Sequence, residues 1–164
     1  MKNAIVVKIS SVLCAIALVS SVLVGCGAGA SVAANETQQA NRAYMSQVNQ
    51  TMQTLDNDLK GFVDAVSRGD IVNMRTQADN AYKTLDKLAA LEVPDDMADI
   101  QQNYVDGTDK LRKALDDYIT LYTEASDPSF DWSTYDARIK DIQALYDEGV
   151  AALQAGDETA ASKS

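Results

Sequence analysis

The chain has 164 residues, of which 24 are acidic and 14 are basic, so its formal net charge is −10; it contains no histidine. The acidic excess argues against nucleic-acid binding, because that affinity comes largely from Lys and Arg side chains that neutralise phosphates. The missing histidine removes the usual base of a catalytic triad and the usual imidazole ligand of a metal-binding helix bundle.

The N-terminus has the layout of a secretory signal peptide. Lys2 and Lys8 precede an apolar stretch over 9–24 that carries no charge. A membrane-spanning helix needs about 20 apolar residues, and this run is shorter and rich in Ser and Ala, so an uncleaved anchor is the less favoured alternative. We therefore predict that residues 1–25 form a signal peptide that is removed.

The residues Leu23, Val24, Gly25 and Cys26 follow this apolar run. In this order they resemble the lipobox of bacterial lipoproteins, a resemblance that covers about the first 26 residues. It implies that the Cys26 thiol receives a diacylglycerol and that cleavage falls just before Cys26. The attached group carries acyl chains such as palmitate, and two such chains give stable membrane anchoring where one gives marginal binding. The implied location is the outer face of a bacterial membrane, which is the cell surface in a Gram-positive host.

Cleavage before Cys26 would remove Cys14, so the mature chain would keep one cysteine and no internal disulfide. It would also remove Lys2 and Lys8, leaving 12 basic and 24 acidic residues, a net charge of −12. An ordinary signal peptide would instead leave a secreted protein with one free thiol, which is unusual. The negative charge favours a solubility role over the alternative of an acidic docking face for a cationic partner.

Four amphipathic helices are predicted after a flexible, lipidated tether over 26–36. Apolar residues recur at intervals of three and four, which is typical of one face of an α-helix. The stripes are Tyr44, Val48, Met52, Leu55, Leu59, Phe62 and Val66 in the first segment; Ile71, Met74, Ala78, Ala81, Leu85 and Leu88, with Leu91 and Val93 at its end, in the second; Met97, Ile100, Tyr104, Thr108, Leu111, Leu115, Tyr118 and Tyr122 in the third; and Trp132, Tyr135, Ile139, Ile142, Tyr146, Gly149 or Val150, and Leu153 in the fourth.

Helix-breaking residues separate these segments. Gly69 and Asp70 indicate a helix exit and an N-cap, Pro94 ends the second helix and opens the third, and 126–129 is a loop by composition. We predict that Gly156 closes the fourth helix and that 156–164 is a disordered tail. Short connections require antiparallel neighbours, so the prediction is an all-α, elongated up-down four-helix bundle over 37–155. A three-helix bundle with a loosely attached first helix is the alternative.

Two short motifs resemble known binding sequences. Arg68-Gly69-Asp70 resembles the integrin-recognition tripeptide, but each residue already has a duty at a helix boundary. The segment from Asp56 to Gly61 begins like a calcium-binding EF-hand loop, but Lys60 stands where an oxygen ligand is needed and Ser67 replaces the bidentate Glu. Both motifs are therefore interpreted as structural, and we predict no metal site and no cofactor.

Tyrosines are the most informative residue class of the body. Buried tyrosine needs a partner for its hydroxyl, so one interpretation is a bundle rim where the hydroxyls reach water. The other is a slot between the third and fourth helices for a small amphiphilic ligand. Gly107 and Gly149 indicate either a close approach of the third and fourth helices or a gap between them. The candidate slot residues are Tyr104, Tyr118, Tyr122, Tyr135 and Tyr146.

The stretch from Leu91 through Val93 and Pro94 into the third helix resembles small helical lipoproteins of Gram-positive bacteria that have no assigned activity. The resemblance covers about half of the domain and assigns no functional residue. The main hypothesis is a non-enzymatic, lipid-anchored, envelope-associated interaction protein with an unknown protein partner. The alternative is a small-ligand binding protein that uses the tyrosine slot, and a hydrolytic or redox enzyme ranks third.

Overall fold

The computed structural model describes residues 32–163, with side chains from residue 36 onward. These residues form four long helices and two short 3-10 turns, and no strand is found among them. The elements are α2 (Val32–Ser67), α3 (Ile71–Ala89), η1 (Asp95–Met97), α4 (Ala98–Ala125), η2 (Trp132–Thr134) and α5 (Tyr135–Ser162). The predicted all-α four-helix bundle is confirmed.

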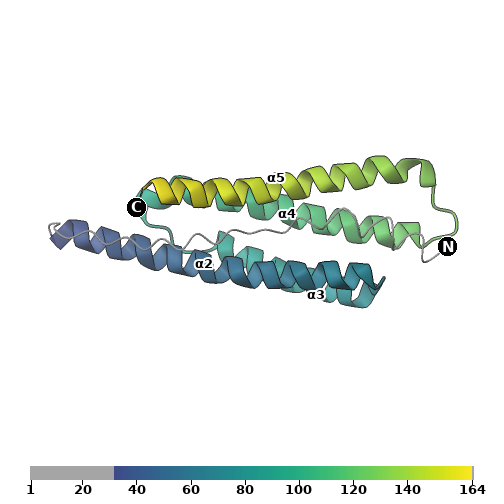
Figure 1. Ribbon diagram of the computed structural model, residues 1–164, viewed down its shortest axis with the longest axis horizontal. Helices are drawn as coiled ribbons and strands as arrows, with labels where there is room; N and C mark the ends of the chain where they lie inside the picture. Colours follow the sequence, from purple (N-terminus) through teal and green to yellow (C-terminus); the bar gives the residue numbers. More distant parts are fainter. Residues whose placement is uncertain (1–31, 164) are drawn as a thin grey trace.

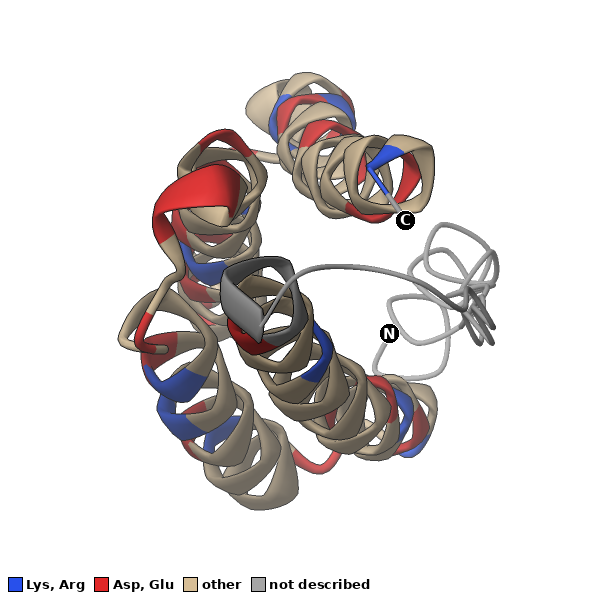
Figure 2. Ribbon diagram, turned by 90° about the vertical axis from the view of Figure 1, so that its left-hand side faces the viewer, with Lys and Arg blue, Asp and Glu red and all other residues tan. Residues whose placement is uncertain are grey.

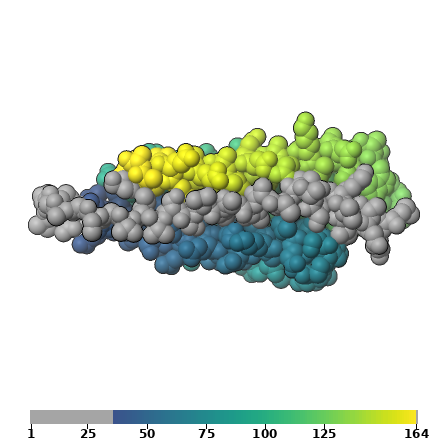
Figure 3. All heavy atoms as spheres, viewed as in Figure 1, coloured from purple at the N-terminus to yellow at the C-terminus, as the bar shows by residue number. Residues whose placement is uncertain are grey.

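The helices run alternately up and down, because each connection is too short to return the chain to the other end (Figure 1). Helix α3 packs against α2 and α4, and α4 packs most extensively against α5. The 36 residues of α2 correspond to about 54 Å at 1.5 Å per residue. The described helices therefore form an elongated body, with α5 along one long edge and α2 and α3 along the other (Figure 3).

The predicted apolar stripes form the core. All seven positions on α2 are buried, which shows that the first helix belongs to the bundle and that the three-helix alternative is wrong. On the other helices most stripe positions are buried, whereas Ile71, Tyr122, Ile139 and Val150 are partly buried. Charged residues are spread over all four helices (Figure 2), as expected for amphipathic helices whose polar faces meet solvent.

The turn between α2 and α3 has the predicted chemistry. Gly69 has a φ of 66°, the left-handed conformation that glycine adopts without a steric penalty. The Asp70 side chain accepts a hydrogen bond from the Asn73 backbone N–H at 3.1 Å, which caps α3. Bonds to the Asn73 backbone and side chain lower the pKa of Asp70. Gly69 and Asp70 thus have the structural roles at the helix boundary that were predicted for them in the Arg68-Gly69-Asp70 motif.

The expected start of the first helix is wrong by five residues. Helix α2 begins at Val32, so residues 32–36, which were assigned to the tether, are helical. Their sequence lacks an apolar stripe, but Ala33, Ala34 and Glu36 are strong helix formers, so helix propensity accounts for the earlier start of α2. The remainder of the predicted tether, 26–31, lies outside the described residues.

The expected end of the last helix is also wrong. Helix α5 continues through Gly156 to Ser162, so most of the predicted disordered tail is helical. Gly156 is buried against the Tyr104 ring, where an added Cβ would lie 2.7 Å from Cε1. Glycine here permits close packing and does not end the helix, and the buried Ala160 continues the packing surface one turn later.

Two smaller expectations also differ from the structure. Helix α3 ends at Ala89, so the partly buried Leu91 and Val93 belong to the connection that leads to η1. Pro94 precedes η1 in an extended conformation, and α4 begins four residues later at Ala98. Trp132 was placed on the core stripe of the fourth helix, but it lies in η2 with half of its surface exposed.

Candidate functional site

The predicted lipid attachment site lies outside the described residues. Leu23, Val24, Gly25 and Cys26 therefore keep the status of a prediction from sequence. Among the helices that the structure describes, none combines the length and the apolar character that crossing a bilayer requires.

The five predicted slot tyrosines do not converge on one place. Tyr104, Tyr118 and Tyr122 lie on α4 at successive levels of the bundle, and Tyr135 and Tyr146 lie on α5. All are buried except Tyr122, which is partly buried. Each tyrosine has its own set of neighbours.

Tyr104 lies near the end of the bundle where α5 finishes, where one set of hydrogen bonds joins α4 to α5 and another joins α4 to α2 and α3. Its hydroxyl donates to Asp157 Oδ1 at 2.6 Å. The Tyr44 hydroxyl of α2 donates to Gln101 Oε1 at 2.7 Å, and Gln101 Nε2 donates to the carbonyl oxygens of Leu88 and Ala89 at 3.1 and 2.9 Å. Gln101 thereby satisfies carbonyls at the C-terminus of α3, where intrahelical donors run out.

Sequence reasoning missed Gln101 and Asp157 because it followed apolar positions alone. Burial raises the pKa of Asp157, and the hydrogen bond from Tyr104 opposes that shift. Burial also raises the pKa of Tyr104, with the neighbouring carboxylate of Asp157 as the next cause. The pair therefore keeps a neutral phenol hydrogen-bonded to a partly buried carboxyl group.

Tyr118 and Tyr146 border a small apolar hollow between α2, α4 and α5. Its volume is about 10 Å³, and it is lined by Phe62, Ala114, Leu115, Tyr118, Ile139, Ile142, Gln143 and Tyr146. The Phe62 ring meets Tyr118 edge-on with centroids 5.6 Å apart. Burial raises the pKa of Tyr146 to about 12. A ligand site usually needs roughly 300 to 1,000 Å³, so this hollow has no room for a small molecule.

Gly107 of α4 and Gly149 of α5 lie where these two helices approach each other closely. A Cβ on Gly107 would lie 2.7 Å from Leu153 Cδ2 and 3.0 Å from the Gly149 carbonyl oxygen, and a Cβ on Gly149 would lie 2.8 Å from Leu111 Cγ. The two backbones are thus in close contact at this level. Of the two meanings that the sequence left open, the structure supports close helix approach and not a gap.

Tyr122 behaves like a residue of the bundle rim. Its hydroxyl donates to the Gly69 carbonyl oxygen at 3.1 Å, which ties the last turns of α4 to the turn between α2 and α3. Sequence reasoning placed it in the slot because it continues the i, i+4 series from Tyr118.

A second surface comes from three aromatic residues at the connection between α4 and α5, which we call the aromatic tip: Phe130, Trp132 and Tyr135. The rings of Phe130 and Trp132 meet edge-on with centroids 5.1 Å apart, and the Trp132 and Tyr135 rings are tilted with centroids 5.5 Å apart. Trp132 is 50% exposed, whereas Tyr135 is buried beneath it. Sequence reasoning missed this surface because it counted Trp132 as a core residue.

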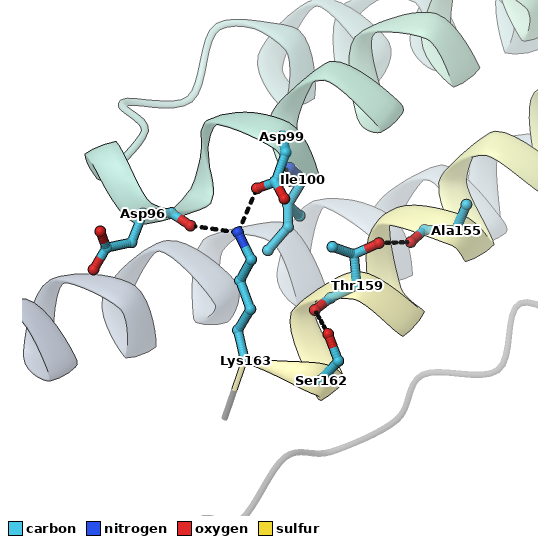
Figure 4. Close-up of polar contacts among 7 residues, drawn as sticks. All are labelled: Asp96, Asp99, Ile100, Ala155, Thr159, Ser162 and Lys163. Atoms are coloured by element: carbon cyan, nitrogen blue, oxygen red, sulfur yellow. Dashed lines mark hydrogen bonds and ion pairs between the residues drawn. The ribbon is translucent and has the colours of Figure 1, made fainter.

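The opposite end of the bundle has an open depression bounded by Asp95, Asp96, Asp99 and Lys163. The Lys163 ammonium donates to the Asp96 carbonyl oxygen at 2.8 Å and to Asp99 Oδ1 at 2.6 Å, and so fastens the end of α5 to the start of α4 (Figure 4). The bond from Lys163 lowers the pKa of Asp99. The described residues include no group of three or more His, Cys, Asp or Glu arranged to hold a metal ion.

Comparisons with protein-family models, with curated proteins and with solved structures found no match to this chain. The resemblance to helical lipoproteins of Gram-positive bacteria therefore stays a prediction.

Proposed function

We propose that this protein is a lipid-anchored, non-enzymatic helical lipoprotein on the outer face of a bacterial membrane, where it acts as an envelope-associated interaction protein. The observation that carries the proposal is the order of features at the N-terminus: lysines, an uncharged apolar run, then Leu23, Val24, Gly25 and Cys26. A diacylglyceryl group on Cys26 supplies the two acyl chains that stable anchoring requires.

The arrangement of the bundle supports a role in presenting a surface. Residues 27–31 separate Cys26 from the start of α2 at Val32, so an anchor at Cys26 attaches close to one end of the long axis. The turn at Gly69 and the loop after Ala125 lie at the other end, because the helices alternate in direction (Figure 1). The bundle thereby holds one end near the membrane and the other about 54 Å from the start of α2.

The small-ligand alternative has less support. It places an amphiphile in a slot lined by Tyr104, Tyr118, Tyr122, Tyr135 and Tyr146, but these residues lie at different levels and the hollow among them measures about 10 Å³. Binding a molecule there requires α2 or α5 to move away from α4, which would break close glycine contacts between α4 and α5 or the Phe62 contact with Tyr118.

A labelling experiment tests the anchor. Cells that produce the full chain are fed a palmitate analogue, and incorporation is compared among wild type, Cys26→Ser and Cys14→Ser. We expect Cys26→Ser to lose the label and to leave the membrane fraction. We expect Cys14→Ser to keep the label and to stay in the membrane fraction, because Cys14 lies inside the signal peptide. Label retained in Cys26→Ser contradicts the proposal.

A second experiment tests the interaction role. The anchored protein is cross-linked on intact cells and recovered from solubilised membranes. Recovery of one stoichiometric protein partner supports the proposal. Recovery of the protein with a bound small amphiphile, and no protein partner, favours the alternative.

A further inference from the structure

The exposed large hydrophobic side chains of the described residues gather at one end of the bundle. They are Val72, which is 71% exposed, and Trp132, which is 50% exposed. Val72 lies in the first turn of α3 and Trp132 lies just before α5, and both helices begin at the end opposite to the start of α2 (Figure 1). An apolar ring presented to solvent at the end of an elongated body is a common feature of interaction surfaces.

Trp132 is held in place before any partner arrives. Its ring lies against Phe130 and Tyr135, and Phe130 also meets Tyr135 edge-on with centroids 6.5 Å apart. The η2 turn beneath it is fixed by the Asp131 side chain, which accepts a hydrogen bond from the Ser133 N–H at 3.0 Å. A fixed aromatic ring loses little conformational entropy on binding, which favours its use as an anchor residue.

The chain segment that carries this ring is acidic. The segment 126–137 contains Asp127, Asp131 and Asp136 and no Lys or Arg. In the part of the chain that the structure describes, none of these three exposed carboxylates forms an ion pair. The nearby Arg138 is already paired with Glu124. The tip therefore offers a half-exposed tryptophan ring and three exposed carboxylates that form no ion pair.

We propose that the aromatic tip, together with Asp127, Asp131 and Asp136, is a docking surface for a Lys- or Arg-bearing segment of a partner protein. A guanidinium or ammonium group is attracted to the face of a tryptophan ring, and adjacent carboxylates accept its hydrogen bonds. The charge complementarity selects this occupant over an acidic or neutral segment. The partner's place in the envelope rests on the proposed function, whereas the chemistry of the surface does not.

Trp132 is the single tryptophan of the chain, so its fluorescence reports directly on the tip. The purified full chain is titrated with an oligoarginine peptide, and affinity is measured in parallel by calorimetry. We expect a saturable change in Trp132 emission. We also expect Trp132→Ala to weaken binding about two- to fivefold, the size of a cation–π contact at an exposed site.

A matched pair of double variants separates the tip from general attraction to an acidic protein. Asp131→Asn with Asp136→Asn removes two charges at the tip, and asparagine keeps the capping oxygen at position 131. Asp95→Asn with Asp96→Asn removes two charges at the opposite end. We expect the tip variant to bind the peptide at least about threefold more weakly than the control variant. Circular dichroism checks that both retain wild-type helicity.

Three outcomes overturn the proposal: equal weakening by the two double variants, no emission change at saturation, or an emission change with a neutral oligosaccharide and none with the peptide. The last would make the tip a glycan-binding surface. The titration is independent of Cys26, so a failure of the anchor in the labelling experiment and a failure of the tip are distinguishable.

Discussion

Glycine has two opposite roles in these helices, which depend on the neighbour that an added methyl group would meet. A Cβ on Gly149 would lie 2.8 Å from Leu111 Cγ and 3.1 Å from the Leu111 backbone nitrogen, which cannot move without separating α4 from α5. A Cβ on Gly61 would lie 2.7 Å from Oε1 at the end of the Gln77 side chain, which can rotate away.

The two glycines therefore make a matched test. We expect Gly149→Ala to destabilise the domain by about 1 to 3 kcal/mol, the usual cost of overpacking. We expect Gly61→Ala to be neutral or to stabilise it by up to about 1 kcal/mol, because alanine is the better helix former. Urea unfolding followed by circular dichroism measures both, and an equal loss in the two variants would contradict the close contact of α4 and α5.

Asp157 predicts a pH dependence that differs from that of most carboxylates here. Its pKa in the folded protein is raised, so its contribution to stability is present when the carboxyl is protonated and is lost as the pH rises through the folded pKa. At neutral pH the buried charge opposes folding. Asparagine keeps an oxygen to accept the Tyr104 hydrogen bond without that charge.

We accordingly expect Asp157→Asn to raise the Tm at neutral pH, and the gain to disappear at a pH near 3, about one unit below the ordinary pKa of an Asp carboxyl, where the group is largely protonated. Thermal melts of wild type and variant at the two pH values give the difference. Asp141→Asn, an exposed change on the same helix, should move the Tm little at either pH. A lower Tm for Asp157→Asn at neutral pH would mean that the charged hydrogen bond outweighs the cost of burial.

At the level of the helices, the sequence predicted where they pack better than where they begin and end. The i, i+3 and i, i+4 spacing located the buried face of every described helix, and Gly69 with Asp70 located a boundary through their own chemistry. The limits at Val32 and Ser162 were missed. Helix propensity without an apolar stripe accounts for the early start of α2 at Val32. Helix α5 continues to Ser162 through Gly156, whose packing partner Tyr104 is distant in sequence.

The end of α3 depends on a side chain from another helix, which the sequence does not reveal. Gln101 of α4 donates to the carbonyls of Leu88 and Ala89 and accepts from Tyr44. We expect Gln101→Ala to destabilise the domain by about 1 to 3 kcal/mol or more, because it leaves buried polar groups without partners. The neighbouring Gln102→Ala, an exposed change, should cost less than about 0.5 kcal/mol. Denaturant titrations compare the free energies of unfolding of the two variants. Similar losses of stability would show that the hydrogen bonds of Gln101 contribute nothing to stability.

At the scale of the whole molecule, the bundle is an elongated body whose two ends differ in chemistry. One end has the Lys163 bonds to Asp96 and Asp99 and lies beside the start of α2. The other presents the half-exposed Trp132 and the exposed carboxylates of Asp127, Asp131 and Asp136, which form no ion pair. The bundle was predicted from the spacing of apolar residues, and the tyrosine slot was a hypothesis from the positions of the tyrosines. The sequence does not reveal that the tyrosines lie at different levels of the bundle or that Trp132 faces solvent. Those facts depend on how α4 and α5 pack and on the η2 turn.

The core of the bundle gives a test of the fold as a unit. Leu85 is 1% exposed at the centre of the α3 stripe. An aspartate there buries a charge without a partner, which destabilises by more than a domain of this size can tolerate. We expect Leu85→Asp to be largely unfolded by circular dichroism. A Tm within a few degrees of wild type would contradict the placement of α3 in the core.

We propose that Cys26 is acylated and becomes the first residue of a helical body that faces outward. Intact-mass spectrometry of the protein extracted from the membranes of cells that produce it tests this claim most directly. We predict a mass that corresponds to a chain that begins at Cys26 and carries a diacylglyceryl group. A chain recovered with residues 1–25 still attached and the Cys26 thiol unmodified would contradict it.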